Sequence, residues 1–149
     1  MFARAQRDHS LCATNLILAK SLPEAQRTIL VHIAPQAVIS GHLSDLDDLL
    51  LMFDVAPSGW DVGGQIYLDY ISLVQEPGTE RRRRGSGSRK DTILRLLRAL
   101  PNMEARTFEQ RVAQSEIARV VANVVVSSSD LVYLSLQNAN LNRVEKSLV

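Results

Sequence analysis

The sequence predicts a single α+β domain over residues 1–149, in which a small, mostly antiparallel sheet packs with about three helices. Two segments predict strands: Thr28 to Ile39, which is rich in β-branched residues, and Asp130 to Gln137, which alternates as a strand does. Pro35 would restrict the first strand to a sheet edge or a bulge. Because strands and helices do not follow one another in regular βα order, a doubly wound parallel sheet is not expected.

The stretch from Ser40 to Val74 predicts the centre of the core, because it is the most apolar part of the chain. A helix is expected at about 44–54 with Ser44 as its N-cap. One face of that helix is apolar and consists of Leu46, Leu49, Leu50 and Phe53. Trp60 is expected to be largely buried. After the Gly63-Gly64 turn, residues 65–74 favour a buried strand through their Tyr, Ile and Val content.

Strand and helix remain open alternatives for residues 10–20, 65–74 and 104–126. Asp91 is expected to cap a helix that stops at Pro101. The next helical period runs from Glu104 to about Asn123, after which three consecutive valines favour a strand. Residues 138–149 form a weakly amphipathic tail.

Composition places the chain among ordinary globular proteins, with 46% apolar and 22% charged residues. Cys12 is the only cysteine, so an internal disulfide is excluded and a reducing compartment is favoured. No run of eighteen apolar residues occurs. We therefore expect a cytoplasmic or nuclear protein, peripheral at a membrane if it meets one, and not a secreted protein.

A flexible basic loop is expected at residues 77–90. Six cations and no acid lie in its last ten residues: Arg81, Arg82, Arg83, Arg84, Arg89 and Lys90. The formal charge of the whole chain is +1, so the remainder of the chain is acidic. Arginine grips phosphate with two parallel hydrogen bonds, which makes these six residues the candidate polyanion-binding site. A solvated linker is the alternative interpretation.

Ser86 follows two arginines and a glycine, a spacing that basophilic protein kinases commonly select, and Ser88 lies two residues further on. Both serines are candidate phosphorylation sites, and both are equally compatible with a plain linker. Phosphate on Ser86 would add about −1.5 to −2 charges beside the arginines and weaken binding to a polyanion.

The sequence provides little evidence for a metal site or for a catalytic site. The possible soft ligands are His9, Cys12, His32 and His42, and their spacing matches no usual zinc site. The aspartates of the 44–54 helix lack the oxygen pattern of a calcium loop. Catalytic triads, a phosphate-binding loop and a dinucleotide-binding glycine motif are all missing from the sequence. We expect no cofactor and no metal.

The order of elements from Thr28 to Val74 is a strand, a helix opened by Ser44-Asp45, Trp60, a glycine turn and a second apolar segment. This layout resembles the central part of the small matrix proteins of rhabdovirus-type negative-strand RNA viruses. The resemblance implies a protein that self-associates, coats an anionic membrane and binds nucleocapsid. The C-terminal half departs from that pattern, and no Pro-Pro-x-Tyr motif occurs.

The expected function is therefore non-enzymatic binding or assembly, with the basic loop contacting an anionic lipid surface, nucleic acid or nucleoprotein, and with possible homo-oligomerisation. A regulatory adaptor with a nuclear-import or kinase-controlled loop is the second hypothesis. A small hydrolase or transferase with a dispersed site is the third. A deep cleft lined by Asp, His and Tyr would favour the enzyme.

Overall fold

A computed structural model describes residues 2–75 and 89–127 of the chain. Within these two ranges every regular element is helical and no strand is present. The α-helices are α1 (Phe2–Leu18), α2 (Leu22–Thr28), α3 (Ala34–Ser40), α4 (Ser44–Leu51), α5 (Gly64–Val74), α6 (Arg89–Ala99) and α7 (Phe108–Ser127). Shorter turns are the π-helix η1 (Ile29–Ile33) and the 3₁₀ turns η2 (Trp60–Val62) and η4 (Leu100–Asn102). The prediction of an α+β fold with an antiparallel sheet is therefore wrong.

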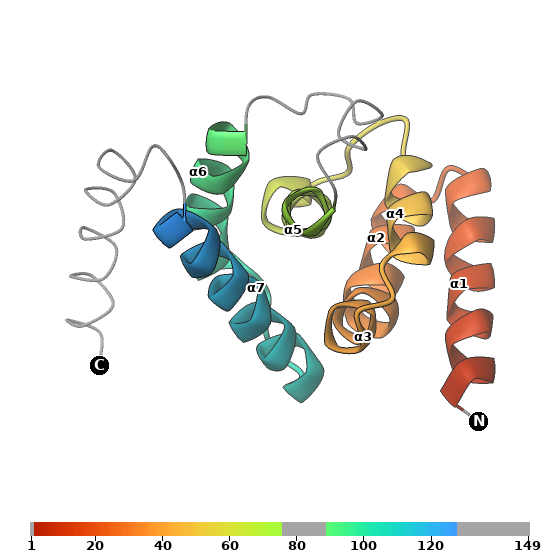
Figure 1. Cartoon of the computed structure of the whole chain (residues 1–149). Coiled ribbons are helices and arrows are strands. Elements are labelled where there is room, and N and C mark those ends of the chain that lie inside the picture. The colour runs from red at the N-terminus through yellow and green to blue at the C-terminus, as the bar shows by residue number, and fades with distance from the viewer. Residues whose placement is uncertain (1, 76–88, 128–149) are drawn as a thin grey trace.

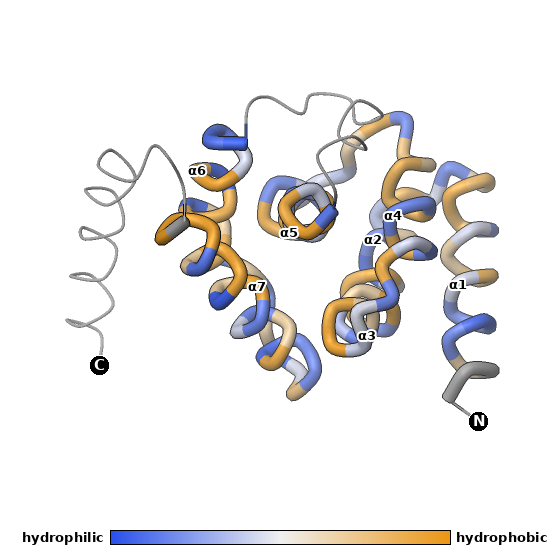
Figure 2. The backbone as a smooth tube through the Cα atoms, viewed as in Figure 1, coloured by the Kyte–Doolittle hydropathy of each residue, from blue (hydrophilic) through white to orange (hydrophobic). Residues whose placement is uncertain are grey.

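Helix α5 lies at the centre of the fold (Figure 1), with α6 and α7 on one side of it and α1 to α4 on the other. Hydrophobic residues recur along the helices (Figure 2), and their buried members form one continuous core. Most residues of α5 are buried, including Ile66, Tyr67 and Ile71. A helix that is apolar almost all round is expected at such a position. The strand prediction for residues 65–74 failed because a short apolar run does not distinguish a buried strand from a buried helix.

The predicted strand at 28–39 is part of a continuous helical run formed by α2, η1 and α3. Its Pro35 is accommodated by the π-helix: the Ala34 N–H bonds to the carbonyl of Ile29, five residues back. In this wider turn the carbonyl of Leu30 would pair with residue 35, which is a proline and has no N–H to give. Proline thus marks a local change of helix type here and not the edge of a sheet.

Gln110 of α7 supplies the donor that Pro35 lacks. Its Nε2 donates to the Leu30 carbonyl at 3.1 Å, across 80 residues of sequence. Its Oε1 accepts the backbone N–H groups of Arg106 and Thr107, at 2.9 and 3.0 Å, and so satisfies free donors just before α7. Gln110 is buried, and its amide joins the start of α7 to the π-turn.

The Gly63-Gly64 turn fits tightly between Trp60 and α2. A Cβ atom on Gly64 would lie 2.4 Å from the indole ring of Trp60. The Gly64 N–H donates to Oε1 of the buried Gln26 at 3.2 Å, so a side chain of α2 closes the start of α5. Trp60 is half-buried and contacts Phe53 with ring centroids 4.9 Å apart. Our expectation of a largely buried tryptophan was too strong.

Helix α4 matches its prediction in its buried face and differs at its ends. Leu46, Leu49 and Leu50 are buried and Phe53 is half-buried. Ser44 is the first helical residue and not the N-cap, which is Leu43 and makes no side-chain capping bond. The helix ends at Leu51, about three residues earlier than expected.

The remaining ambiguous segments, 10–20 and 104–126, are mainly helical, although the helix in the second begins only at Phe108. Residues 10–20 lie mainly in α1, and α7 continues through the valines at 124–126, which were expected to be a strand. Burial explains the second difference, because Ala113, Ile117, Val121 and Val125 form one buried stripe with helical spacing. The expected strand at 130–137 and the tail at 138–149 lie outside the described residues.

Candidate functional site

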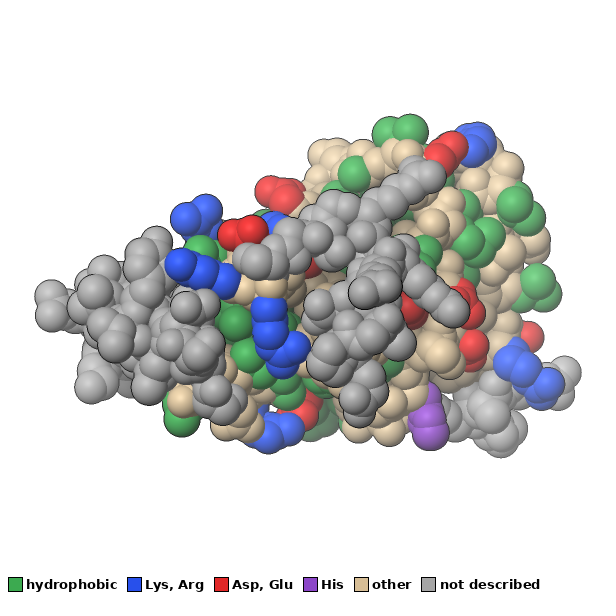
Figure 3. Space-filling view, turned by 45° about the horizontal axis from the view of Figure 1, so that its top comes forward, with side chains coloured by type: hydrophobic (Ala, Val, Ile, Leu, Met, Phe, Trp, Pro, Cys, Tyr) green, Lys and Arg blue, Asp and Glu red, His purple; other side chains and the backbone are tan. Residues whose placement is uncertain are grey.

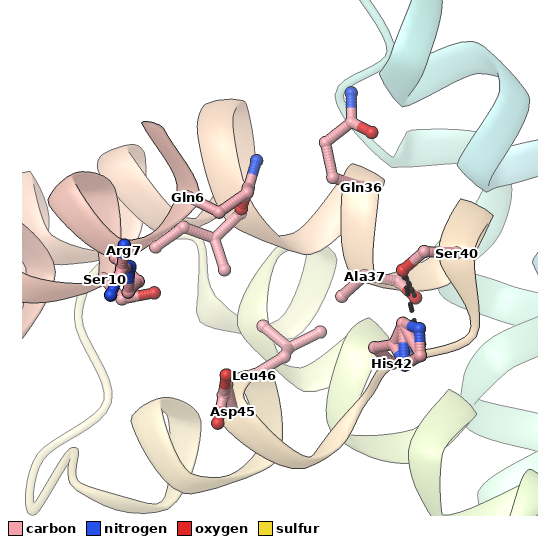
Figure 4. A pocket seen from close by; sticks show the side chains of 10 residues that line it. Gln6, Arg7, Ser10, Gln36, Ala37, Ser40, His42, Asp45 and Leu46 are labelled. Carbon is pink, nitrogen blue, oxygen red and sulfur yellow. Dashed lines mark hydrogen bonds between the residues drawn. The ribbon is translucent and has the colours of Figure 1, made fainter. Parts of the chain in front are cut away.

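A groove of about 600 Å³ lies between α1, α3 and α4 (Figure 4). This volume is in the range of protein pockets that take a small molecule or a few side chains of a partner. Its lining residues are Gln6, Arg7, Ser10, Ile33, Gln36, Ala37, Ser40, His42, Asp45 and Leu46. Three of these, Ile33, Ala37 and Leu46, belong to the buried core and form an apolar floor, and the other residues are polar.

Contacts of the π-turn fix the position of α1 and therefore the width of the groove. Gln6 of α1 donates from Nε2 to the His32 carbonyl at 3.1 Å. One turn further along α1, the His9 ring stacks on the His32 ring with centroids 4.2 Å apart and planes 2° from parallel. Burial, followed by the charge of His9, lowers the pKa of His32. Both contacts use parts of η1, so the π-turn positions α1 as well as α7.

The far end of the groove is set by the turn between α3 and α4. Gly41 ends α3 in the left-handed conformation at φ 80°, and its N–H bonds to the Ala37 carbonyl at 2.9 Å. The Ser40 hydroxyl accepts the backbone N–H of His42 at 3.3 Å. This turn brings His42 to the rim beside the first turn of α4, where Asp45 lies.

The groove carries side chains of opposite charge on two different helices. Arg7 comes from α1 and Asp45 from α4. Ser40 bonds to the main chain of His42 and not to its ring, so no nucleophile–base pair is formed there. Tyr67 and Tyr70 lie in the core, where burial raises the pKa of both phenols. The described groove is thus a surface of mixed polarity.

Most of the predicted polyanion-binding residues fall outside the described residues: Arg81, Arg82, Arg83 and Arg84, together with the candidate phosphorylation sites Ser86 and Ser88. Arg89 and Lys90 begin α6, where a loop was predicted. Arg89 donates from Nη2 to the Leu73 carbonyl at 3.4 Å, in the last turn of α5. A cation at that end of a helix is favourable, so Arg89 contributes to the link between α5 and α6.

The four soft metal ligands do not converge. In the described part of the chain no three His, Cys, Asp or Glu side chains are placed to hold a metal ion. His9 and His32 stack on one another, Cys12 is exposed on α1, and His42 lies at the other end of the groove. Of the aspartates near α4, Asp54 pairs with Lys20 at 2.7 Å, and that hydrogen bond lowers the pKa of Asp54.

Sequence reasoning missed the groove residues, because their proximity depends on a helical α2–η1–α3 run. Gln36 and Ser40 lie four residues apart, as do Ile33 and Ala37, which is the spacing of one helix face. That signal was present within the segment interpreted as a strand. The match between Gln6, Arg7 and Ser10 of α1 and this face required the tertiary structure.

These features define the class of protein as a module that is all-helical within the described ranges and that carries a groove between α1, α3 and α4. The chain is similar to parts of two nuclear pore proteins. It is 36% identical over 77 residues to the Nuclear pore complex protein Nup98-Nup96 of Drosophila melanogaster, which covers 48% of this chain. It is 31% identical over 124 residues to Nucleoporin nup189 of Schizosaccharomyces pombe, which covers 81% of this chain.

The matched segments span only 4% and 7% of the length of these two relatives. No protein-family model matches the chain, and no solved structure matches it. None of the helices in the described ranges has the length and apolar character needed to cross a bilayer.

The resemblance to rhabdovirus-type matrix proteins is wrong on two grounds. The sequence relatives are nucleoporins. The resemblance depended on Thr28 to Ile39, which was interpreted as a strand, and on residues 65–74, which favoured one, and both segments are helical. The expectation of a viral matrix-like assembly protein that coats a membrane, which followed from this resemblance, is therefore also wrong.

Proposed function

We propose that this chain acts in the nuclear pore complex as a helical structural segment, without catalysing a reaction. The observation that carries the proposal is the similarity to nup189, which extends over 81% of this chain at 31% identity. A second nuclear pore protein, from an insect, is similar over about half of the chain.

The geometry of the described residues agrees with a structural role. Helices are joined by specific long-range bonds: Gln110 to the Leu30 carbonyl, Gln26 to the start of α5, and Arg95 to Asp69. The groove combines an apolar floor with a charged rim, which is the usual composition of a protein–protein contact. The proposed location is accordingly the nuclear pore, and the proposed partners are other proteins of that complex.

The test is a segment exchange in fission yeast. The part of nup189 that matches this chain is replaced by the chain, and the chimera carries a fluorescent tag. We expect the chimera to give a nuclear-rim signal and to co-purify with other nuclear pore proteins. A chimera that is stable in the cell but diffuse would contradict the proposal.

A matched control separates folding from function. Ile71 is fully buried in α5, so Ile71→Asp should unfold the segment and abolish both the nuclear-rim signal and the co-purification. Arg98→Ser changes an exposed position of α6 and should leave both as they are with the unaltered chain. A nuclear-rim signal and co-purification that persist in the Ile71→Asp chimera would contradict a role for the fold of the matched segment.

A further inference from the structure

The outer surface of α1 and the end of α4 expose more aliphatic side chain than the rest of the described surface. Leu11 and Leu18 of α1 are 61% and 68% exposed, and Val55, after α4, is 63% exposed. Leu51 and Met52 complete this set, which we name the α1–α4 surface. Figure 3 shows hydrophobic side chains gathered on the right-hand side of the molecule, where α1 and α4 lie in Figure 1.

Contacts at both ends hold the two helices side by side. At one end, Gln6, Arg7 and Ser10 of α1 face Asp45 and Leu46 of α4 across the groove. At the other end, the Lys20 ammonium pairs with the Asp54 carboxylate at 2.7 Å. The aliphatic side chains therefore belong to one surface carried by two neighbouring helices, and the two charges at this end of it neutralise each other.

Core packing does not require these side chains to be apolar. In α1 the buried residues Ala13 and Ile17 are four apart and face the core. Leu11 and Leu18 are seven apart and lie on a different side of the same helix. A helix with a second apolar stripe, pointing away from the core, is typical of a contact with another protein.

The charges at one edge of the α1–α4 surface indicate what kind of partner fits. Among the side chains that the structure describes, exposed carboxylates lie there at Asp8 of α1 and at Asp45 and Asp48 of α4, together with the guanidinium of Arg7. A second copy of the chain would bring a second set of these carboxylates, and an anionic lipid surface would be repelled by them. A partner with Lys or Arg beside its aliphatic side chains would be attracted.

We propose that the α1–α4 surface binds an amphipathic helix of another protein, whose aliphatic stripe is followed by Lys or Arg side chains that face Asp45 and Asp48. Two parallel helices present rows of side chains between which a third helix can pack. The inference rests on the exposed side chains and charges of this surface. It does not depend on the nuclear pore role.

The probe is a synthetic helical peptide of about 18 residues, long enough to form a helix in water, with four leucines at helical spacing and lysines in its last turn. A matched peptide carries glutamates in place of the lysines. Binding of each fluorescent peptide to the full-length chain is measured by anisotropy. An environment-sensitive dye on Cys12, which is exposed on α1 and is the only cysteine, reports whether the bound peptide lies on this surface.

We expect the lysine peptide to bind and to shift the emission of the dye on Cys12 to the blue. Leu18→Asp should weaken binding about tenfold or more, as expected for a central contact. Asp48→Lys should reverse the preference between the two peptides. Phe108→Asp is the control, because Phe108 is 67% exposed on α7, away from this surface, and the change should leave binding intact. Circular dichroism melting curves establish that each variant is folded.

Three results would overturn the proposal. The first is absence of binding by the lysine peptide, or an equal loss with Leu18→Asp and Phe108→Asp. The second is a dimer of the unmodified chain in light scattering that Leu18→Asp disperses, which would assign the surface to a second copy. The third is co-sedimentation with phosphatidylserine vesicles that Leu18→Asp abolishes, which would assign it to lipid.

Discussion

Arg95 of α6 holds both carboxylate oxygens of Asp69 of α5, with Nε 3.1 Å from Oδ2 and Nη2 2.9 Å from Oδ1. The Asp69 side chain is only 6% exposed and also accepts a bond from Gln65 at 3.0 Å. Gln65 in turn accepts the indole N–H of Trp60 at 3.1 Å. The hydrogen bond to Asp69 raises the pKa of Arg95, which favours the charged guanidinium. One chain of bonds therefore runs from η2 through α5 to α6.

Removal of the guanidinium should leave the buried Asp69 carboxylate uncompensated. Loss of one partner from a buried pair costs roughly 3–5 kcal/mol, and we expect the low end for Arg95→Met because the arginine side chain is 38% exposed. Urea unfolding measures the change. The double variant Asp69→Leu/Arg95→Met should recover much of the loss. Equal unfolding midpoints for Arg95→Met and for the exposed control Arg98→Met would contradict a stabilising role for the pair.

The bond between Gln110 and the π-turn gives a second expectation. Gln110→Met removes the donor to the Leu30 carbonyl and the acceptor of two N–H groups, and each buried group left unsatisfied costs about 1–3 kcal/mol. Pro35→Ala restores a backbone N–H beside that carbonyl. In a double-mutant cycle by urea unfolding, Pro35→Ala should reduce the cost of Gln110→Met. Strict additivity of the two changes would show that the glutamine does not replace the missing proline donor.

The contact between Gly64 and Trp60 should tolerate no side chain. Gly64→Ala places a methyl group 2.4 Å from the indole ring, and overpacking of this kind costs about 1–3 kcal/mol. Thermal melting followed by circular dichroism measures the loss of stability in every variant, and Trp60 fluorescence reports any movement of the ring where the tryptophan is kept. Since Trp60→Leu removes the atoms that collide, Gly64→Ala should cost less in that background. If Gly64→Ala lowers the stability of the Trp60→Leu variant as much as that of the unaltered chain, the glycine is required for a reason other than contact with the indole ring.

The stacked histidines predict a stability that falls in mild acid. Because the folded-state pKa of His32 is lowered, the unfolded chain binds a proton more readily than the folded chain. The contribution of neutral His32 to the free energy of unfolding is therefore complete above the pKa that histidine has in the unfolded chain, about 6.5. It declines as the pH falls below that value. Urea midpoints at about pH 7.5 and pH 5.5 should differ less in His32→Gln than in the unaltered chain. His42→Gln, at the groove rim, is the control and should keep the full difference.

The sequence alone established the apolar face of α4 and most of α6. In α4, Leu46, Leu49 and Leu50 have a helical period, and Pro57 and Gly59, which both disfavour a helix, follow before the next element. In α6, Ile93 and Leu96 repeat at helical spacing before Pro101. In both segments the hydrophobic pattern and the turn residues indicate the same structure. The helices could therefore be predicted without knowledge of contacts with residues far along the chain.

Only the tertiary structure decided the segments at 28–39 and 65–74 and the groove that depends on the first of them. Ile29 and Ile33 prefer strands by composition, yet both are buried in a helix whose irregular turn is completed by Gln110 from 80 residues away. Strand preference spans only about 1 kcal/mol per residue, whereas burying an isoleucine or leucine is worth about 1.5–3 kcal/mol. Burial therefore outweighs strand preference in these segments. Since the neighbours that bury them lie far along the chain, a local pattern does not reveal that burial, and the packed structure determines the outcome.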